Sequence, residues 1–113
     1  MNNQVDAHLI ETKLKSQELF SGHFLHAFRD TVALPDGSEA TREYFVHPGA
    51  VMIIAMLEEP GQPLRLVMER QYRYPVQQVM IEFPAGKLDP NELTLQCAQR
   101  ELFEETGFRA KQW

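Results

Sequence analysis

The alternation of apolar and polar positions divides the chain into a strand-rich first part and one amphipathic helix near the end. Residues 1–15 are polar and mixed, and we expect them to be frayed or to form a short helix. Residues 18–29 and 30–34 carry the aromatic and β-branched side chains typical of strands, and residues 40–46 resume this pattern after a Pro-Asp-Gly turn signal. The pattern predicts a three-stranded antiparallel unit, ending at the turn-forming residues 47–49.

A second group of strands is predicted between this unit and the helix. The apolar run over residues 50–57 is continuous and indicates one buried strand, which a segment rich in Pro, Gly and Glu brings to an end. Residues 64–72 and 79–83 indicate two more strands. Gly86 follows soon after, where the absence of a side chain would let the backbone approach a neighbouring site closely.

The helix carries strong boundary signals. Asp89 can cap its start, Pro90 suits the first helical position, and Glu92 stands three residues after the cap. Gly107 is placed to end the helix in a left-handed conformation. We therefore expect one helix to run from about Pro90 to Gly107.

Composition and charge describe an ordinary globular chain. With 113 residues, 43% apolar and 24% charged, it can bury one modest core and is not of the disordered class. A net charge of −5 argues against a nucleic-acid partner, which would need a basic surface. No apolar run approaches the ~18 residues of a membrane span.

The cysteine content and the start of the chain bear on location. Cys97 is the only cysteine, so the chain cannot form an internal disulfide, and the first residues lack a secretion signal pattern. We therefore expect a cytoplasmic protein without a membrane partner. Cys97 falls in the middle of the helix, where a small buried side chain is a better interpretation than a catalytic thiol.

Three carboxylates gather at the end of the predicted helix, where they are unfavourable. Glu101, Glu104 and Glu105 lie within an arc about 100° wide at the helical spacing of about 100° per residue. Two of them stand in the last turn, where the helix dipole opposes negative charge by about 0.3–1 kcal/mol each. A divalent cation would offset this cost, and oxygen ligands without His or Cys suit Mg²⁺ or Mn²⁺. A solvated acidic helix face is the alternative interpretation.

The residues around these carboxylates resemble the Nudix box, a motif of the form Gly-x5-Glu-x7-Arg-Glu-U-x-Glu-Glu-x-Gly-U in which U is a bulky apolar residue. The match covers residues 86–108 and holds at every defined position. The matching residues are Gly86, Glu92, Arg100, Glu101, Leu102, Glu104, Glu105, Gly107 and Phe108. The chain is therefore similar to Nudix hydrolases, which cleave nucleoside diphosphates linked to another group.

Flanking segments narrow the resemblance to a subfamily. Residues 82–89 resemble the lead-in E-x-P-A-G-x-x-D of ADP-ribose pyrophosphatases and related nucleotide-sugar hydrolases, and residues 69–73 resemble the strand that brings an arginine to the substrate diphosphate. Three short stretches between residues 34 and 50 are similar to the N-terminal region of those enzymes. The similarity runs from about residue 18 to the end and is strongest over residues 82–108.

The residues and the resemblance together suggest a metal site. Glu101 and Glu105, one helical turn apart, are the expected principal ligands of Mg²⁺ or Mn²⁺, with Glu104 contributing directly or through water. Arg100 cannot bind a cation, but it can orient a carboxylate with a forked hydrogen bond. The resemblance adds the backbone carbonyl of Ala85 as a ligand.

Substrate contacts are predicted on the strand and its surroundings. Arg73 is our first choice for the diphosphate, because a planar guanidinium suits phosphate. Arg70 is the alternative, and since it lies three residues away on one strand, only one of the two can face the site. The resemblance also implies substrate-binding roles for Glu82 and Arg42.

These observations define an expected architecture. We expect an α+β fold, with residues 47–113 forming the first part of an α/β/α Nudix sandwich around a mixed sheet, incomplete at its C-terminal end. Residues 1–46 would form the small antiparallel β region before it. That region is too small to bury both faces, and in the subfamily it packs across a homodimer, so we expect it to be a dimerisation element.

Three functions remain open from the sequence. The first is metal-dependent hydrolysis of a nucleoside diphosphate sugar, with ADP-ribose cleaved to AMP and ribose 5-phosphate. The second is the same reaction on another nucleotide sugar such as GDP-mannose. The third is an inactive Nudix fragment that acts only as a binding or interaction module, because the chain ends five residues after the motif.

Overall fold

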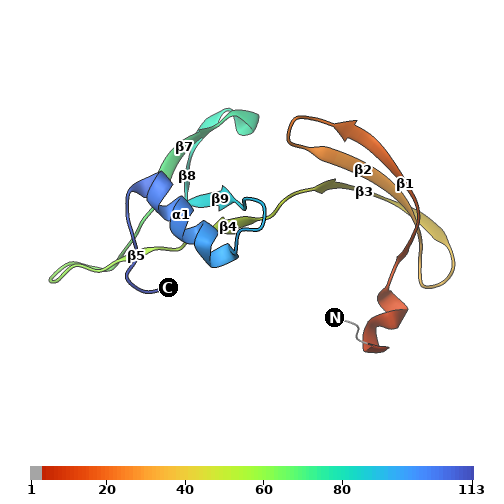
Figure 1. Cartoon of the computed structure of the whole chain (residues 1–113), viewed down its shortest axis with the longest axis horizontal. Helices are drawn as coiled ribbons and strands as arrows, with labels where there is room; N and C mark the ends of the chain where they lie inside the picture. Colours follow the sequence, from red (N-terminus) through yellow and green to blue (C-terminus); the bar gives the residue numbers. More distant parts are fainter. Residues whose placement is uncertain (1–3) are drawn as a thin grey trace. The chain divides into compact units, whose positions relative to one another are not determined.

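The computed structural model describes residues 4–113, which form two compact units. The first unit extends to His47 and the second begins at Pro48. Figure 1 shows the elements of both units in chain order.

The first unit is the three-stranded antiparallel sheet that the sequence predicted. A 3₁₀ helix, η1 (Gln4–Leu9), precedes β1 (Thr12–Ser21), β2 (His26–Ala33) and β3 (Glu39–Val46), and β2 lies in the middle. The sequence placed the first strand at residues 18–29 and the second at residues 30–34, and these bounds were wrong. The first strand begins at Thr12, and a tight turn closes after it, with the Gly22 amide donating to the Leu25 carbonyl at 2.7 Å.

Little of this sheet is buried. Val32 and Asp30 on β2 are its buried residues, and the Tyr44 hydroxyl donates to the Asp30 carboxylate at 2.9 Å. Hydrogen bonds from Ser16 and Tyr44 lower the pKa of Asp30, so this carboxylate stays ionised inside the sheet. The Phe28 ring stacks on the Tyr44 ring with 5.8 Å between their centroids.

The second unit is built from short antiparallel ladders and one helix. β4 pairs with β9, β5 with β6, and β7 with β8. A 3₁₀ turn, η2, connects β7 to β8, and α1 follows β9. The bounds are β4 Ala50–Met52, β5 Met56–Leu57, β6 Arg65–Leu66, β7 Glu69–Arg73, η2 Tyr74–Val76, β8 Gln78–Glu82, β9 Ala85–Lys87 and α1 Thr94–Thr106.

The continuous strand predicted over residues 50–57 is divided in two. Residues 53–55 separate β4 from β5, because the chain changes partner there: the Ile53 amide donates to the Pro84 carbonyl, and the Ala55 carbonyl accepts from Val67. A mixed sheet, with parallel and antiparallel strand pairs, was expected. All strand pairs among residues 4–113 are antiparallel, so the described residues contain no parallel pair.

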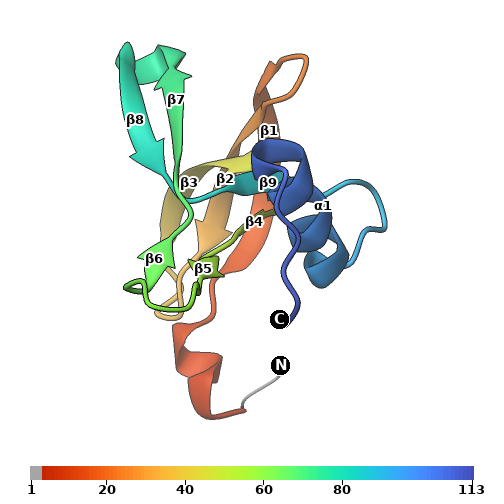
Figure 2. The ribbon, with the colours of Figure 1, turned by 90° about the vertical axis from the view of Figure 1, so that its left-hand side faces the viewer.

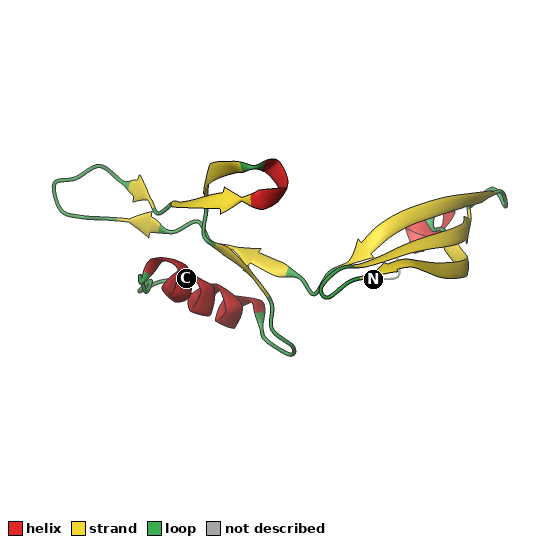
Figure 3. Ribbon diagram, turned by 90° about the horizontal axis from the view of Figure 1, so that it is seen from above, coloured by secondary structure: helices red, strands yellow, loops and turns green. Residues whose placement is uncertain are grey.

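Helix α1 packs along β4 and β9, as Figures 2 and 3 show from two sides. The core lies between them and consists of four buried side chains: Ile53, Pro84, Cys97 and Leu102. Cys97 has no exposed surface, as the sequence predicted for a structural cysteine. No helix of residues 4–113 combines the length and apolar character needed to span a membrane.

Candidate metal centre

A turn, and not the first turn of a helix, occupies residues 89–92. The Glu92 amide donates to the Asp89 carbonyl at 3.1 Å, and Asn91 has a positive φ of 62°. Pro90 followed by a left-handed residue is the pattern of a type II turn, so the predicted helix start at Pro90 was wrong. The helix begins four residues later, at Thr94, and its end agrees with the prediction: Gly107 is left-handed, with φ 76°.

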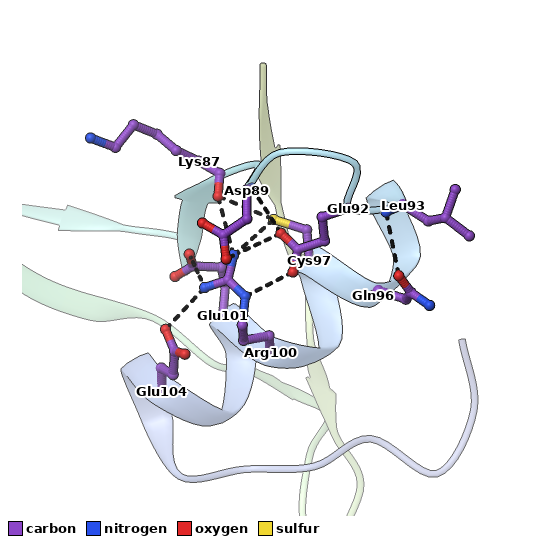
Figure 4. Close-up of polar contacts among 9 residues, drawn as sticks. All are labelled: Lys87, Asp89, Glu92, Leu93, Gln96, Cys97, Arg100, Glu101 and Glu104. Carbon is purple, nitrogen blue, oxygen red and sulfur yellow. Dashed lines mark hydrogen bonds and ion pairs between the residues drawn. The ribbon is translucent and has the colours of Figure 1, made fainter. Parts of the chain in front are cut away.

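Arg100 is the centre of a polar network that this turn and the helix build together. Its Nε and Nη2 donate to the two carboxylate oxygens of Glu92 at 2.8 and 2.9 Å, which is the forked geometry expected of arginine. Nη1 donates to Glu101 at 2.9 Å and to Glu104 at 3.2 Å, and Nη2 also reaches the Lys87 carbonyl at 3.2 Å. Figure 4 shows the guanidinium surrounded by these oxygen atoms.

Arg100 therefore binds Glu92 through two nitrogen atoms, Nε and Nη2, and Glu101 through Nη1 alone. Glu92 also accepts a hydrogen bond from the Asp89 amide at 3.0 Å, so its carboxylate closes the turn. Arg100 and this amide lower the pKa of Glu92 to about 2. The carboxylates around Arg100 raise its own pKa, so the guanidinium stays charged. Glu92 therefore closes the turn ahead of the helix, and the helix-capping role expected of it was wrong, because α1 begins only at Thr94.

Glu101 lies directly on the backbone of Gly86. A Cβ atom at position 86 would stand 1.9 Å from Cδ of Glu101 and 2.2 and 2.3 Å from its two oxygens. The Glu101 side chain is only 11% exposed, in contrast to 55% for Glu104. The glycine is needed here because it makes room for a carboxylate that the helix presses against β9.

Glu105 turns toward strand β7, where it forms a hydrogen bond with the half-buried Glu69. Two carboxyl groups can share a hydrogen bond only if one of them holds a proton. Burial, the bond to Glu105 and the charges of Glu105 and Glu82 raise the pKa of Glu69 to about 7. Sequence reasoning missed Glu69, since a Glu on a strand beside Arg70 gives no signal of a partner 36 positions away.

The three glutamates predicted as ligands therefore do not converge on one point. Glu101 lies on Gly86, Glu104 is exposed beside Arg100, and Glu105 contacts Glu69. Within residues 4–113, no three acidic, His or Cys side chains converge in a way that could hold an ion. Glu101 and Glu104 accept from the same nitrogen of Arg100, Nη1, whereas Glu105 turns to Glu69.

The predicted substrate residues have separate positions. Arg73 forks onto Glu82, with Nε and Nη2 at 2.7 and 2.6 Å from the carboxylate oxygens, and this pairing lowers the pKa of Glu82. Arg70 is exposed and pairs with Ile81 in the hairpin. Both arginines lie on β7, and side chains three residues apart leave a regular strand on opposite faces, so the choice between them for the diphosphate stays a prediction.

The other two predicted positions lie elsewhere. Ala85 opens β9 opposite Met52 and is half-buried beside the Gly86–Glu101 contact. Arg42 belongs to the first unit, where its Nε and Nη2 bond the carboxylate of Glu11 at 2.9 and 2.5 Å. Its predicted role in substrate binding stays a prediction.

The Glu69–Glu105 pair gives a testable pH dependence. Below about pH 4.5, Glu69 is protonated in both the folded and the unfolded chain. Between that value and about pH 7, only the folded chain holds the proton, so the free energy of unfolding falls as pH rises. Urea unfolding should show a loss on the order of 1 kcal/mol across this window in the native chain.

The Glu69→Gln variant should show no such loss, because an amide can donate to Glu105 at every pH. Glu39→Gln, an exposed carboxyl of the other unit, is the control and should follow the native chain. Equal pH profiles for the native chain and the Glu69 variant would exclude the shared proton.

Comparison with known protein families identifies two matching domains in this chain. Residues 46–113 match the NUDIX domain, and residues 11–45 match the nucleoside diphosphate sugar hydrolase N-terminal domain. Because the first match alone covers more than half of the chain, the chain belongs to the Nudix family.

Individual relatives narrow the comparison. An ADP-ribose pyrophosphatase of Bacillus subtilis is 38% identical over 103 residues, which are 91% of this chain and 54% of that protein. An ADP-ribose pyrophosphatase of Mycobacterium tuberculosis is 40% identical over 110 residues, 94% of this chain and 49% of that protein. A methanol dehydrogenase activator of Bacillus methanolicus is 41% identical over 102 residues, 90% and 53% of the two chains.

The fold agrees with a solved structure described as an ADP compounds hydrolase. The TM-score is 0.75 at 24% identity, over 90% of this chain and 54% of that chain. The Nudix-type fold expected from the sequence is thus confirmed. The chain spans about half the length of the curated relatives that it matches.

Proposed function

We propose that this chain carries the metal-binding part of a hydrolase that cleaves the diphosphate of a nucleoside diphosphate sugar, with ADP-ribose as the substrate and AMP and ribose 5-phosphate as the products. The observation that supports this most is the contact between Glu101 and Gly86, since a chain kept only for its fold would have no need to hold a carboxylate in that place. The names of the relatives from Bacillus subtilis and Mycobacterium tuberculosis support the substrate.

The donor set fits a hard divalent cation. Glu101 is nearly buried, and Glu69 and Glu105 crowd two carboxyl groups into one contact, an arrangement that a cation would relieve. Glu101 and Glu105 would hold Mg²⁺ or Mn²⁺, with Glu104 and the Ala85 carbonyl as further oxygen donors. A bound cation supplies charge for the phosphate oxygens and lowers the pKa of a coordinated water.

The protein groups around the site have defined tasks in this proposal. Arg100 holds Glu101 through Nη1 and fixes the turn through Glu92, so the helix and β9 keep their spacing when charge changes in the site. Arg73 would contact the diphosphate, exchanging one or both bonds to Glu82 for phosphate oxygens of similar geometry. Holding the attacking water and the diphosphate in the right orientation lowers the reaction barrier by several kcal/mol. In this proposal Arg73 orients the diphosphate, and Arg100 orients the Glu101 carboxylate.

Hydrolysis of ADP-ribose in the presence of Mg²⁺ tests the proposal. The chain should be compared with a version extended by the part of the Bacillus subtilis relative that lies outside the match, with GDP-mannose as the alternative substrate. We expect AMP from ADP-ribose with the longer chain and weak or no turnover with the 113 residues alone, because these cover 54% of that relative and hydrolysis requires water and substrate to be held in line. Release of no AMP by the longer chain would contradict the proposed function.

We also propose that the first unit mediates homodimer formation. The unit leaves large aromatic side chains at the surface: on the strands, Phe20 is 57% exposed, Phe45 61% and Tyr44 41%, and in the turn between β1 and β2, Phe24 is 41% exposed. A three-stranded sheet with so few buried residues needs a second layer for stability. Light scattering at tens of micromolar should give twice the monomer mass, and Phe45→Asp should reduce it. A monomer at that concentration, without loss of solubility, would contradict the dimer.

A further inference from the structure

The chain enters the second unit through a segment that is bonded to the candidate metal site. Residues 47–49 connect β3 to β4, and the second unit begins within them, at Pro48. The Gly49 carbonyl accepts a hydrogen bond from the Leu88 amide at 3.0 Å. Leu88 directly follows β9, the strand in which Gly86 lies against the Glu101 carboxylate. The start of the unit and the site are therefore joined by one short stretch of backbone.

The hydrogen bond from Leu88 to Gly49 extends the pairing of β4 with β9. Residues 49–53 lie opposite residues 84–88, and the rows inside the two strands are Ala50–Lys87, Val51–Gly86 and Met52–Ala85. At the other end of this ladder, the Ile53 amide donates to the Pro84 carbonyl at 2.8 Å. Since β4 pairs with the strand that carries the site, a displacement of β9 also displaces the residues that lead into β4.

Gly49 has a conformation and a neighbour that both favour glycine. Its φ is 99°, a value that other residues rarely adopt. A Cβ atom at this position would stand 2.8 Å from Cδ1 of Leu88, so the leucine side chain packs directly on the glycine backbone. We call the hydrogen bond and the packing contact between Gly49 and Leu88 the latch.

The residue before the latch is bonded to helix α1. The Lys87 carbonyl accepts from Nη2 of Arg100 at 3.2 Å and from Sγ of Cys97 at 3.4 Å, as Figure 4 shows. Arg100 also donates to Glu101 through Nη1, at 2.9 Å. The contacts that hold β9 against α1 thus lie on both sides of the latch residue's neighbour, at the site and along the helix. A change in how firmly β9 and α1 are held together reaches the latch through the backbone.

We propose that the latch couples the metal site to the segment that joins the two units. This coupling rests on the proposed function: a cation held by Glu101 and the Ala85 carbonyl would tie β9 to α1, so the latch would open less often. Coupling between two sites is reciprocal, and a change that opens the latch must therefore weaken cation binding. The occupancy of the site then determines how freely residues 47–49 move.

Hydrogen exchange of the Leu88 amide tests the coupling, because this amide is the donor of the latch. The rate is measured by NMR with and without saturating Mg²⁺, which is diamagnetic and leaves the spectra sharp. We expect exchange to slow at least fivefold, the lower end of the range of about 5- to 150-fold typical of coupled sites. The control is the Gln62 amide, which donates to the Glu59 carbonyl in an exposed turn of the same unit and should keep its rate.

Titration calorimetry of Gly49→Ala tests the reciprocal effect. The added methyl group meets Leu88, and the Mg²⁺ affinity should fall at least fivefold. Gly61→Ala is the matched control: Gly61 also has a positive φ, 74°, but a Cβ there would have no neighbour within 4 Å, so only the backbone strain is reproduced. Leu88→Ala removes the packing contact without backbone strain and should weaken binding in the same direction. Circular dichroism should show that the variants keep α1, and Leu88→Ala decides if Gly49→Ala does not fold.

The outcomes distinguish this coupling from the proposed function. Mg²⁺ binding by the native chain with an unchanged Leu88 rate, or with equal slowing of the Gln62 amide, would overturn the coupling alone. Equal losses of affinity in Gly49→Ala and Gly61→Ala, or native affinity in Leu88→Ala, would also overturn it, because the latch would then not influence the site. No Mg²⁺ binding by the native chain would contradict the proposed function and the coupling together.

Discussion

A Glu101→Gln, Glu105→Gln double variant is expected to lose Mn²⁺ binding, as measured by titration calorimetry. Both residues are predicted ligands, and amide oxygens carry no charge to hold a hard divalent cation. The loss of Mn²⁺ affinity should exceed the roughly 10- to 100-fold loss that follows when a hydrogen-bond partner of a metal ligand is removed. A Glu58→Gln, Glu59→Gln variant, which removes the same charge from the hairpin loop, is the control and should bind like the native chain.

Thermal unfolding should separate this binding effect from a structural one. In chelator, removing the negative charge of Glu104 or of Glu105 alone, in the last turn of α1, should stabilise the chain by a few tenths to about 1 kcal/mol. At a Mn²⁺ concentration of about 100 Kd, the native chain should gain about 2.7 kcal/mol and the double variant nothing. Equal Mn²⁺ binding by the two chains would show that these carboxylates are not ligands. Clear destabilisation of either single variant in chelator would instead indicate a structural salt-bridge role.

The sequence predicted helix boundaries correctly where a residue pattern is compatible with a single local structure, and wrongly where it is compatible with two. Gly107 ends α1 as expected, because a glycine after a helical pattern has few other uses. Asp89 and Pro90 also start turns, and Asn91 decides between the two by adopting a positive φ. The helix start was therefore misplaced by four residues, although the motif that contains it was identified correctly.

The candidate site shows a second limit. The spacing of Glu101, Glu104 and Glu105 placed them on one helix face, but it could not show which partners they would find. Those partners, Gly86, Arg100 and Glu69, come from β9, the helix itself and β7, and only tertiary packing brings them together. The fork of Arg73 onto Glu82 has the same origin, since a hairpin joins residues that are nine apart.

The contact between Gly86 and Glu101 should make Gly86→Ala far more damaging than a single methyl group suggests. The new Cβ would stand 1.9 Å from Cδ of Glu101, so the carboxylate must leave or β9 must separate from α1. Overpacking of this kind costs about 1–3 kcal/mol of unfolding free energy. A displacement of about 1 Å in a site can cost about 100-fold in activity, and we expect a loss of Mn²⁺ affinity of that order in calorimetry.

A double-mutant cycle identifies the cause. If the clash with Glu101 is the whole effect, Glu101→Ala removes the obstacle, and Gly86→Ala should then cost little unfolding free energy in that background. The coupling between the two positions should lie within the range of about 0.5–3 kcal/mol that contacting residues show. Urea unfolding of the four chains in chelator measures it without any metal. Additive changes in unfolding free energy would mean that the backbone or another neighbour requires Gly86. The Glu101 carboxylate would then not be the reason for a glycine at this position.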